Sequence, residues 1–298
     1  MAGPSRSLTS GGIFYSLARF SLPVLLTLFL QALYGGVDLL VVGQFASTAD
    51  VSGVSTGSML LSTFTMLVTG LSMGPTVTVG EAIGSGSPKE AGRAVLAGLT
   101  LLGSSFLVIQ ALVNSMGTTA SAGVGVGEKV CTFIMLVPSA YTQSMSAFVA
   151  QNRGAGRMDR AQRALRCGIL SSLVVGAFMG ALTFWHGDWL AALFARDPAV
   201  VAAARQYLQA YAIDCLLTPL LFCFTGYFNG CEKTLFVMAQ GIIGAFCVRI
   251  PVAWAMSRLP ETSLFLIGLG TPASSLVQDL LCVGYFLLLM RKSGRESG

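Results

Sequence analysis

Three aspartates, Asp38, Asp214 and Asp279, lie inside long apolar stretches of the sequence, where ionisable side chains are unusual. A carboxylate at the centre of a bilayer costs about 3 kcal/mol on insertion scales, so such a residue is a functional candidate by default. Burial favours the protonated form of a carboxyl group, which suits a side chain that exchanges a proton or holds Na⁺. The alternative is a buried acid that is paired within a helix bundle.

Amide and aromatic side chains near these aspartates are candidate cavity-lining residues. Gln278 is adjacent to Asp279, while Gln31 and Tyr34 precede Asp38 by about two turns and one turn of a helix. Together with Asp214 and Asp279, these residues are predicted to line a cavity for a cation or a substrate. Packing of the two aspartates against Arg249 is the alternative interpretation.

The composition indicates that these residues lie in a membrane. Of the 298 residues, 54% are hydrophobic and only 10% are charged, where a soluble domain carries about 25% charged residues. The lipid bilayer is therefore the expected surrounding. The net charge of +5 does not indicate a nucleic-acid partner, because most of the basic residues fall between the apolar segments, as they do in cytoplasmic loops.

The apolar segments predict an all-α integral membrane protein with about eight transmembrane helices, since about 20 apolar residues cross a bilayer as a helix. The predicted spans are Phe20–Gly43, Gly53–Gly80, Ala94–Val113, Val124–Ala150, Cys167–Trp185, Ala202–Gly226, Leu235–Met256 and Leu264–Met290.

Charge in the loops predicts the orientation. Alternate loops are basic, and they contain Arg6, Lys89, Arg93, Arg153, Arg157, Arg160, Arg163, Arg166, Lys233, Arg291, Lys292 and Arg295. The intervening loops contain only Arg196 and Arg258 as basic residues, with several acidic ones. The positive-inside rule then places both the N and C termini in the cytoplasm.

The sequence offers little equipment for enzymatic catalysis or metal binding. His186 is the only histidine, and the seven cysteines form no CxxC pair. HExxH and phosphate-binding Gly-rich motifs are absent from the sequence, and no filter-like repeat indicates a channel. We therefore predict no enzymatic activity, no cofactor and no metal site.

The sequence matches itself when it is shifted by 70 residues. Gly84-Ser85-Gly86 aligns with Gly154-Ala155-Gly156, and Ala91, Arg93 and Gly98 align with Ala161, Arg163 and Gly168. Both copies run in the same direction through the predicted membrane. Such a parallel repeat is one of the two kinds of repeat that build transporters.

Several motifs resemble those of multidrug and toxic compound extrusion (MATE) transporters, especially the DinF-like branch. The first is Leu33–Asp38 followed by Val41-Val42-Gly43, which resembles the first helix of that family. The others, in order, are Asn114–Thr118, Phe148–Gly156, Gly226–Gly230 and Val248-Arg249-Ile250 with Trp254. The resemblance implies an exporter and assigns Asp38 to cation coupling.

The resemblance also implies a shortened chain. Family members have about twelve helices in two lobes, so about four helices are missing, and the third span joins the start of the family's third helix to the end of its seventh. We expect an incomplete two-lobe parallel repeat: a reduced N-terminal lobe over 1–107, a nearly complete C-terminal lobe over 108–290 and a cytoplasmic tail over 291–298.

The expected function is secondary active multidrug efflux, in which amphiphilic or cationic compounds leave in exchange for H⁺ or Na⁺. The expected partners are a small amphiphilic substrate, the bilayer and a second copy of the chain in a homodimer. The expected location is the cell membrane as a multi-pass protein, in the inner or plasma membrane of a bacterium. The alternative is a truncated, membrane-embedded remnant that does not transport.

Overall fold

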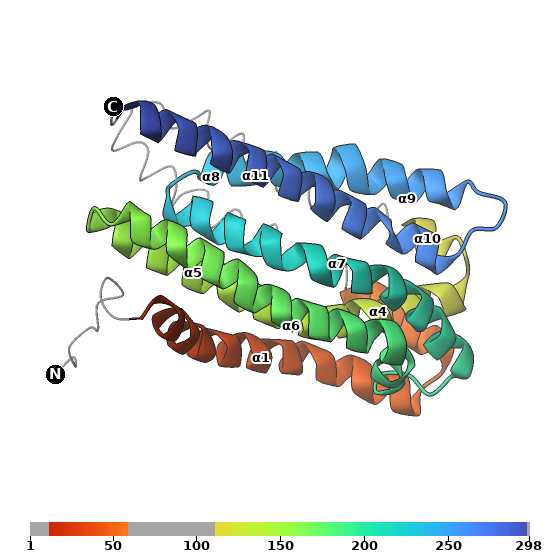
Figure 1. Ribbon diagram of the computed structural model, residues 1–298. Coiled ribbons are helices and arrows are strands. Elements are labelled where there is room, and N and C mark those ends of the chain that lie inside the picture. The colour runs from red at the N-terminus through yellow and green to blue at the C-terminus, as the bar shows by residue number, and fades with distance from the viewer. Residues whose placement is uncertain (1–11, 59–110, 297–298) are drawn as a thin grey trace, which may run out of the picture.

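The fold is a bundle of long helices. The structure, a computed structural model, describes residues 12–58 and 111–296, without the side chains of residues 34, 35, 38 and 292–296. Every secondary-structure element in these ranges is a helix (Figure 1). This confirms the predicted all-α class.

The first helix, α1 (Ile13–Phe45), is followed by helical residues 48–58 and, after the gap in the description, by helical residues 111–114. The remaining elements follow in chain order: α4 (Thr118–Ile134), α5 (Leu136–Gly154), α6 (Met158–Ala192), α7 (Pro198–Gly230), α8 (Thr234–Ile242), the π-helix η1 (Ile243–Arg249), α9 (Ile250–Ser257), α10 (Leu264–Gly268) and α11 (Gly270–Glu296).

Six of the predicted spans are helical in the described residues. Five helical segments are long and apolar enough to cross a membrane, and α4 with α5 makes a sixth that is bent by 41°. The bend lies at Met135, where Pro138 cannot donate a backbone hydrogen bond to Ile134. The predicted spans Gly53–Gly80 and Ala94–Val113, the first copy of the repeat and the lobe boundary at 107–108 fall largely or wholly outside the described residues.

Helix α7 is the central helix of the bundle. In its most apolar 18-residue stretch 56% of the residues are buried, against 28% or less in the other four single spans. Close packing of α6 explains part of this burial. Gly176 and Gly180 form a GxxxG pair, and a Cβ at Gly176 would lie 2.4 Å from the carbonyl oxygen of Cys215. Small residues at this spacing let two membrane helices approach closely.

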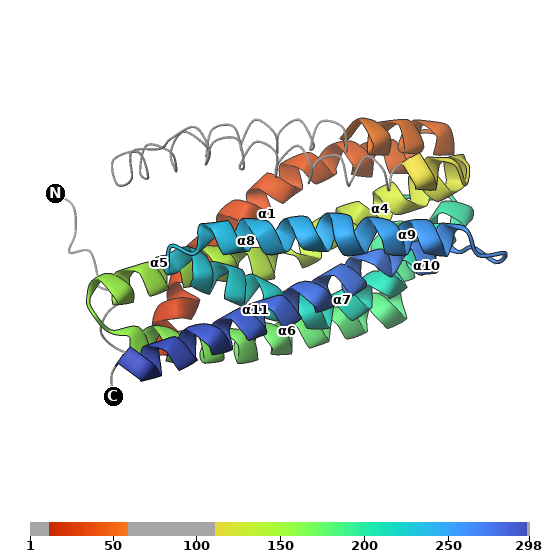
Figure 2. The same cartoon turned by 90° about the horizontal axis from the view of Figure 1, so that it is seen from above.

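Apolar side chains fill two cores, one toward each end of the bundle. One core includes Val126, Leu208 and Leu39, and the other includes Phe148, Phe228 and Leu17. Helix α1 therefore contributes to both cores and packs along the bundle over most of its length. Figure 2 shows α8, η1 and α9 as one rod beside α11.

The turns alternate between the two ends of the bundle (Figure 1). The α5–α6 and α7–α8 turns lie at one end with the C-terminal end of α11. We call this the basic end because Arg157 and Lys233 lie in these turns and Arg153 lies in the last turn of α5. The far end holds the end of α1, the α6–α7 turn and the α9–α10 turn. This alternation follows the loop charges used above, and the cytoplasmic position of the basic end remains a prediction.

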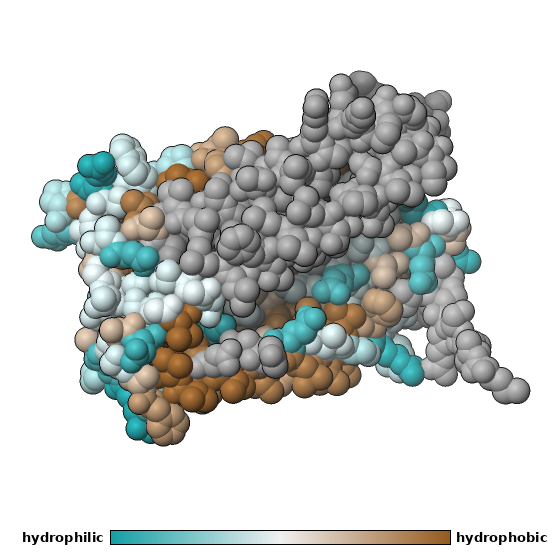
Figure 3. Space-filling view, turned by 180° about the vertical axis from the view of Figure 1, so that it is seen from behind, coloured by the Kyte–Doolittle hydropathy of each residue, from teal (hydrophilic) through white to brown (hydrophobic). Residues whose placement is uncertain are grey.

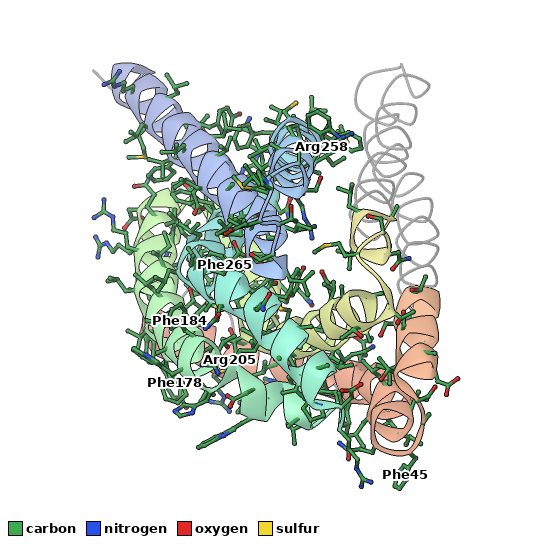
Figure 4. All side chains as sticks on the ribbon, turned by 90° about the vertical axis from the view of Figure 1, so that its right-hand side faces the viewer. Phe45, Phe178, Phe184, Arg205, Arg258 and Phe265 are labelled. Atoms are coloured by element: carbon green, nitrogen blue, oxygen red, sulfur yellow. The ribbon has the colours of Figure 1, made fainter. Side chains whose placement is uncertain are left out.

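The outer surface of the bundle is largely apolar. In Figure 3, apolar residues gather along the lower side of the described surface, and polar residues lie mostly toward its two ends. Phe178 and Phe184 on α6 lie at the periphery in Figure 4, with 68% and 43% of their surface exposed. Such exposure of aromatic side chains fits contact with lipid rather than water.

A polar junction ties α1 to the α6–α7 turn at the far end. Gln44 donates to the carbonyl oxygens of Ala192 and Leu193 at 3.1 Å and accepts from Arg196 at 2.6 Å. Thr48 donates to Asp197 at 2.5 Å, and Asp197 also caps α7 by accepting from Ala199. We call these contacts, with Gly43, the far-end junction.

Candidate functional site

The polar face of α7 points into the bundle and organises the candidate site. Tyr207, Tyr211, Asp214 and Thr218 recur at intervals of four, three and four residues, so they lie on one face of the helix. Asp214 and Thr218 are almost fully buried, with 3% and 2% of their surface exposed. A buried polar stripe of this kind in a membrane helix needs partners on the neighbouring helices.

The first group of partners surrounds Glu128 of α4. Tyr207 donates its hydroxyl hydrogen bond to Oε1 of Glu128 at 2.6 Å, and Nη2 of Arg249 lies 4.0 Å from the same oxygen. The other carboxylate oxygen, Oε2, makes no hydrogen bond to the described residues, and 29% of the Glu128 side chain is exposed. The triad therefore leaves one oxygen of Glu128 open to a ligand.

The three residues of this triad lie at similar depth. Glu128 is ten residues from the far-end start of α4, Tyr207 is nine from that of α7, and Arg249 is eight from the far end of α9. At a rise of 1.5 Å per residue these positions lie about 12–15 Å from the far end. Since α7 has 33 residues and is therefore about 50 Å long, the triad lies on the far-end side of the middle of the bundle.

The second group begins about two turns after Tyr207 along α7, toward the basic end. Thr218 donates to Oδ2 of Asp214 at 2.9 Å, and Ser275 of α11 faces the same carboxylate. Asp279 lies one turn after Ser275, only 4% exposed, and within electrostatic reach of Asp214. Since α7 and α11 both run from the far end to the basic end, the two aspartates occupy one shared polar region.

This second group contains polar atoms without hydrogen-bond partners. Oδ1 of Asp214 and both carboxyl oxygens of Asp279 are buried and make no hydrogen bond within the described structure. Buried polar groups in native proteins are generally paired, so each exception needs a cause such as a proton, a water molecule or a bound cation. The two aspartates are thus suited to bind H⁺ or Na⁺.

A π-helix, η1, packs against α11, the helix that contains Gln278 and Asp279. A Cβ at Gly244 in η1 would lie 2.2 Å from Nε2 of Gln278, so only glycine lets Gln278 pass this close. Gln278 donates to Ser274 at 2.9 Å. The π-helix ends at Arg249, and Pro251 follows in the first turn of α9. Short π-helical segments occur frequently at functional sites.

The comparison with known families identifies the chain. Residues 23–109 and 98–255 match the family model MatE, so the two matches together cover most of the sequence. The chain belongs to the MATE family. Members of this family are transporters, which agrees with the prediction that the chain is not an enzyme, and a MATE protein is a multi-pass protein of the cell membrane.

Two curated relatives of this MATE chain are bacterial. The probable multidrug resistance protein YoeA of Bacillus subtilis is 23% identical over 194 residues, 65% of this chain and 42% of YoeA. The probable multidrug resistance protein NorM of Listeria monocytogenes is 26% identical over 184 residues, 59% of this chain and 38% of NorM. The matched part of the chain spans about two fifths of the length of these relatives.

The fold is also similar to a solved MATE structure. A multidrug resistance MATE family transporter of the MOP superfamily in its outward-facing conformation superposes with a TM-score of 0.60 at 12% identity. The superposition covers 70% of this chain and 46% of that chain. This similarity supports the MATE-like bundle.

The MATE structure brings some of the predicted site residues together. Asp214 of α7 and Asp279 of α11 lie within electrostatic reach of each other, while Gln278, next to Asp279, lies against Gly244 of η1 and donates to Ser274. Gln31 is exposed on α1, away from that region. Asp38 and Tyr34 lie in α1, but their side chains are outside the described part of the structure, so their predicted roles remain predictions.

Sequence reasoning missed Glu128 and Tyr207, and it named Arg249 as a packing partner for the aspartates and as part of a family motif. The signal for Glu128 was present, because it is an ionisable residue inside the predicted span Val124–Ala150. The rule that selected Asp38 applies equally to it. Tyr207 carries no such signal, since a tyrosine in an apolar segment is common and its partner lies 79 positions away in the sequence.

Proposed function

We propose that this MATE chain exports small amphiphilic or cationic compounds in exchange for H⁺ or Na⁺. The observation that carries the proposal is the buried pair Asp214 and Asp279, whose unpaired oxygens lie at membrane depth in a chain of a transporter family. Ionisable residues in that setting mark ion pathways and proton relays. The names of the relatives, which include multidrug resistance proteins, support the substrate class.

The proposed mechanism is alternating access. A proton or Na⁺ on a buried carboxylate removes its uncompensated charge and so favours one conformation over the other. Release of the cation on the opposite side reverses that preference. Asp38 in α1 is the coupling residue that the DinF-like resemblance implies, and Asp214 with Asp279 forms a further carboxylate group in the C-terminal bundle.

A transport-inactive remnant is the alternative, because the chain spans only part of the length of its relatives. Under our proposal a second copy of the chain in a homodimer supplies the missing half of the cavity, as symmetric association commonly does.

Efflux of a fluorescent cationic dye from cells tests the proposal. We expect cells expressing the chain to export the dye faster than empty-vector cells, and an Asp38→Asn version to lose that difference. The amount of inserted protein is measured for both versions by immunoblotting of the membrane fraction. Dye retention equal to that of empty-vector cells, with the chain inserted, would support the inactive remnant instead.

A further inference from the structure

We propose that Glu128 is the binding site for the positive charge of an amphiphilic cation, and that Arg249 is the counter-ion that this cation displaces. The proposal rests on the proposed function for its substrate class, but it concerns binding and not transport. It follows from how Glu128 is held, how far it is exposed and what surrounds Arg249.

Glu128 is oriented but not saturated. Tyr207 and Arg249 both face Oε1, at 2.6 and 4.0 Å, which fixes the carboxylate and leaves Oε2 without a hydrogen bond to the described residues. A separation of 4.0 Å is at the outer limit of an ion pair and longer than a charge-assisted hydrogen bond, which is about 2.7–2.9 Å. The pair is therefore loose enough for a competing cation to enter.

Access also distinguishes Glu128 from the other acids of the α7 polar face. Its side chain is 29% exposed, whereas Asp214 and Asp279 are only 3% and 4% exposed. A bulky organic cation can reach the first and not the other two. The smaller ions H⁺ and Na⁺ remain the suitable ligands for the deeper pair.

Arg249 interacts with two carboxylates. Its Nη2 lies 4.0 Å from Oε1 of Glu128, and its guanidinium group also interacts electrostatically with Asp214. It is also the last residue of the π-helix, where the backbone register changes. When a cation pairs with Glu128, Arg249 moves toward Asp214. The guanidinium group of Arg249 thereby links substrate binding to the charge state of Asp214 and Asp279.

Two probe ions of the same shape and opposite charge test this inference on the purified full chain in detergent. Tetraphenylphosphonium and tetraphenylborate each carry four phenyl groups around one central atom. We expect Glu128→Gln to weaken tetraphenylphosphonium binding by about tenfold or more, as loss of a charged partner does. Binding of tetraphenylborate should not weaken.

Arg249→Gln gives the sharper result, because the proposal predicts that it strengthens tetraphenylphosphonium binding, whereas Glu128→Gln weakens it. Without its competitor, tetraphenylphosphonium should bind more tightly than it does to the unmodified chain. If Glu128 and Arg249 only hold the fold, both substitutions would weaken binding alike. The double variant Glu128→Gln/Arg249→Gln lacks both charges of this pair, and it should bind as weakly as Glu128→Gln.

Glu232→Gln is the matched control, since Glu232 is an exposed acid that pairs with Arg153 at the basic end. It should bind both probes as the unmodified chain does, and circular dichroism confirms that each variant is folded. Unchanged tetraphenylphosphonium binding in Glu128→Gln, or weaker binding in Arg249→Gln, would overturn the inference. Dye export without this binding pattern would overturn the inference alone, whereas the pattern without dye export would overturn only the proposed function.

Discussion

The far-end junction and the α7 polar face are both polar regions of an otherwise apolar bundle, yet they are built differently. At the junction Gln44, Thr48 and Asp197 each form hydrogen bonds at 2.5–3.1 Å. On the α7 face the oxygens of Asp279 and one oxygen of Asp214 have no partner among the described residues. Paired groups stabilise a structure, while unpaired buried charges destabilise it, so the second region is the better candidate for function.

The junction also lacks space for a drug-sized ligand. A surface hollow of about 160 Å³ lies beside Gly43, Thr48 and Asp197, where sites for such ligands measure about 300–1,000 Å³. Its contacts join α1 to the α6–α7 turn, so we assign it a structural role.

Gly43→Ala should break the junction and give the largest loss of stability. A Cβ at position 43 would lie 1.5 Å from the carbonyl oxygen of Phe194, so the backbone of α1 or of the turn must move. We expect a loss of about 1–3 kcal/mol, as in overpacked cores, measured by chemical unfolding in detergent.

Gly53→Ala is the matched control for that substitution. Nothing lies within 4 Å of a Cβ at position 53, which is helical. It should raise stability by up to about 1 kcal/mol, the difference in helix propensity between glycine and alanine. Equal destabilisation by both substitutions would contradict the close approach at Gly43.

Asp279→Leu should have the opposite effect on the α7 polar face. The substitution removes two buried oxygens that have no hydrogen bond in the described structure. Replacing such a group with an apolar one of similar size should stabilise the chain by about 1–2 kcal/mol, while dye export is lost. A clear loss of stability would show that Asp279 has a structural partner, and the contrast with the junction would then fail.

Acidification should distinguish the far-end junction from the α7 polar face, with a smaller effect on stability than the substitutions above. The hydrogen bond from Thr48, with a further one from the backbone of Ala199, lowers the pKa of Asp197 below its ordinary value of 3.8. A lowered pKa in the folded state contributes stability above pH 3.8, and that contribution is lost as the pH falls through the folded-state pKa.

Thr48→Val removes the hydrogen bond that lowers the pKa of Asp197 most. The thermal stability of this variant should therefore decline less than that of the unmodified chain between pH 5 and about pH 3. The melting temperature in detergent, followed by circular dichroism, measures this difference. Dye export at neutral pH should be unchanged. Parallel declines in the two proteins would mean that the Thr48–Asp197 contact does not persist in solution.

Helices were predictable from apolar length, but their ends and bends were not. The predicted span Cys167–Trp185 lies within α6, Met158–Ala192, because the rule for spans detects only apolar residues and the helix continues through its basic start. The span Val124–Ala150 is bent at Met135, and Pro138 alone does not specify a bend, since Pro23 and Pro219 lie inside unbroken helices.

The candidate site was predictable only one residue at a time. Charge at membrane depth identified Asp214 and Asp279, but their proximity depends on how α7 packs against α11. The triad of Glu128, Tyr207 and Arg249 joins three segments that are far apart in the sequence. Such contacts are set by helix packing, which a single sequence does not specify.

Transport of tetraphenylphosphonium into proteoliposomes tests the central claim that the α7 polar face is the functional site. An imposed pH or Na⁺ gradient should drive the cation across vesicles that contain the unmodified chain. Asp214→Asn should slow this movement by about tenfold or more, because the residue no longer changes charge, while Thr48→Val should leave it unchanged. Gradient-driven movement at the same rate in Asp214→Asn vesicles, or none with the unmodified chain, would contradict the account.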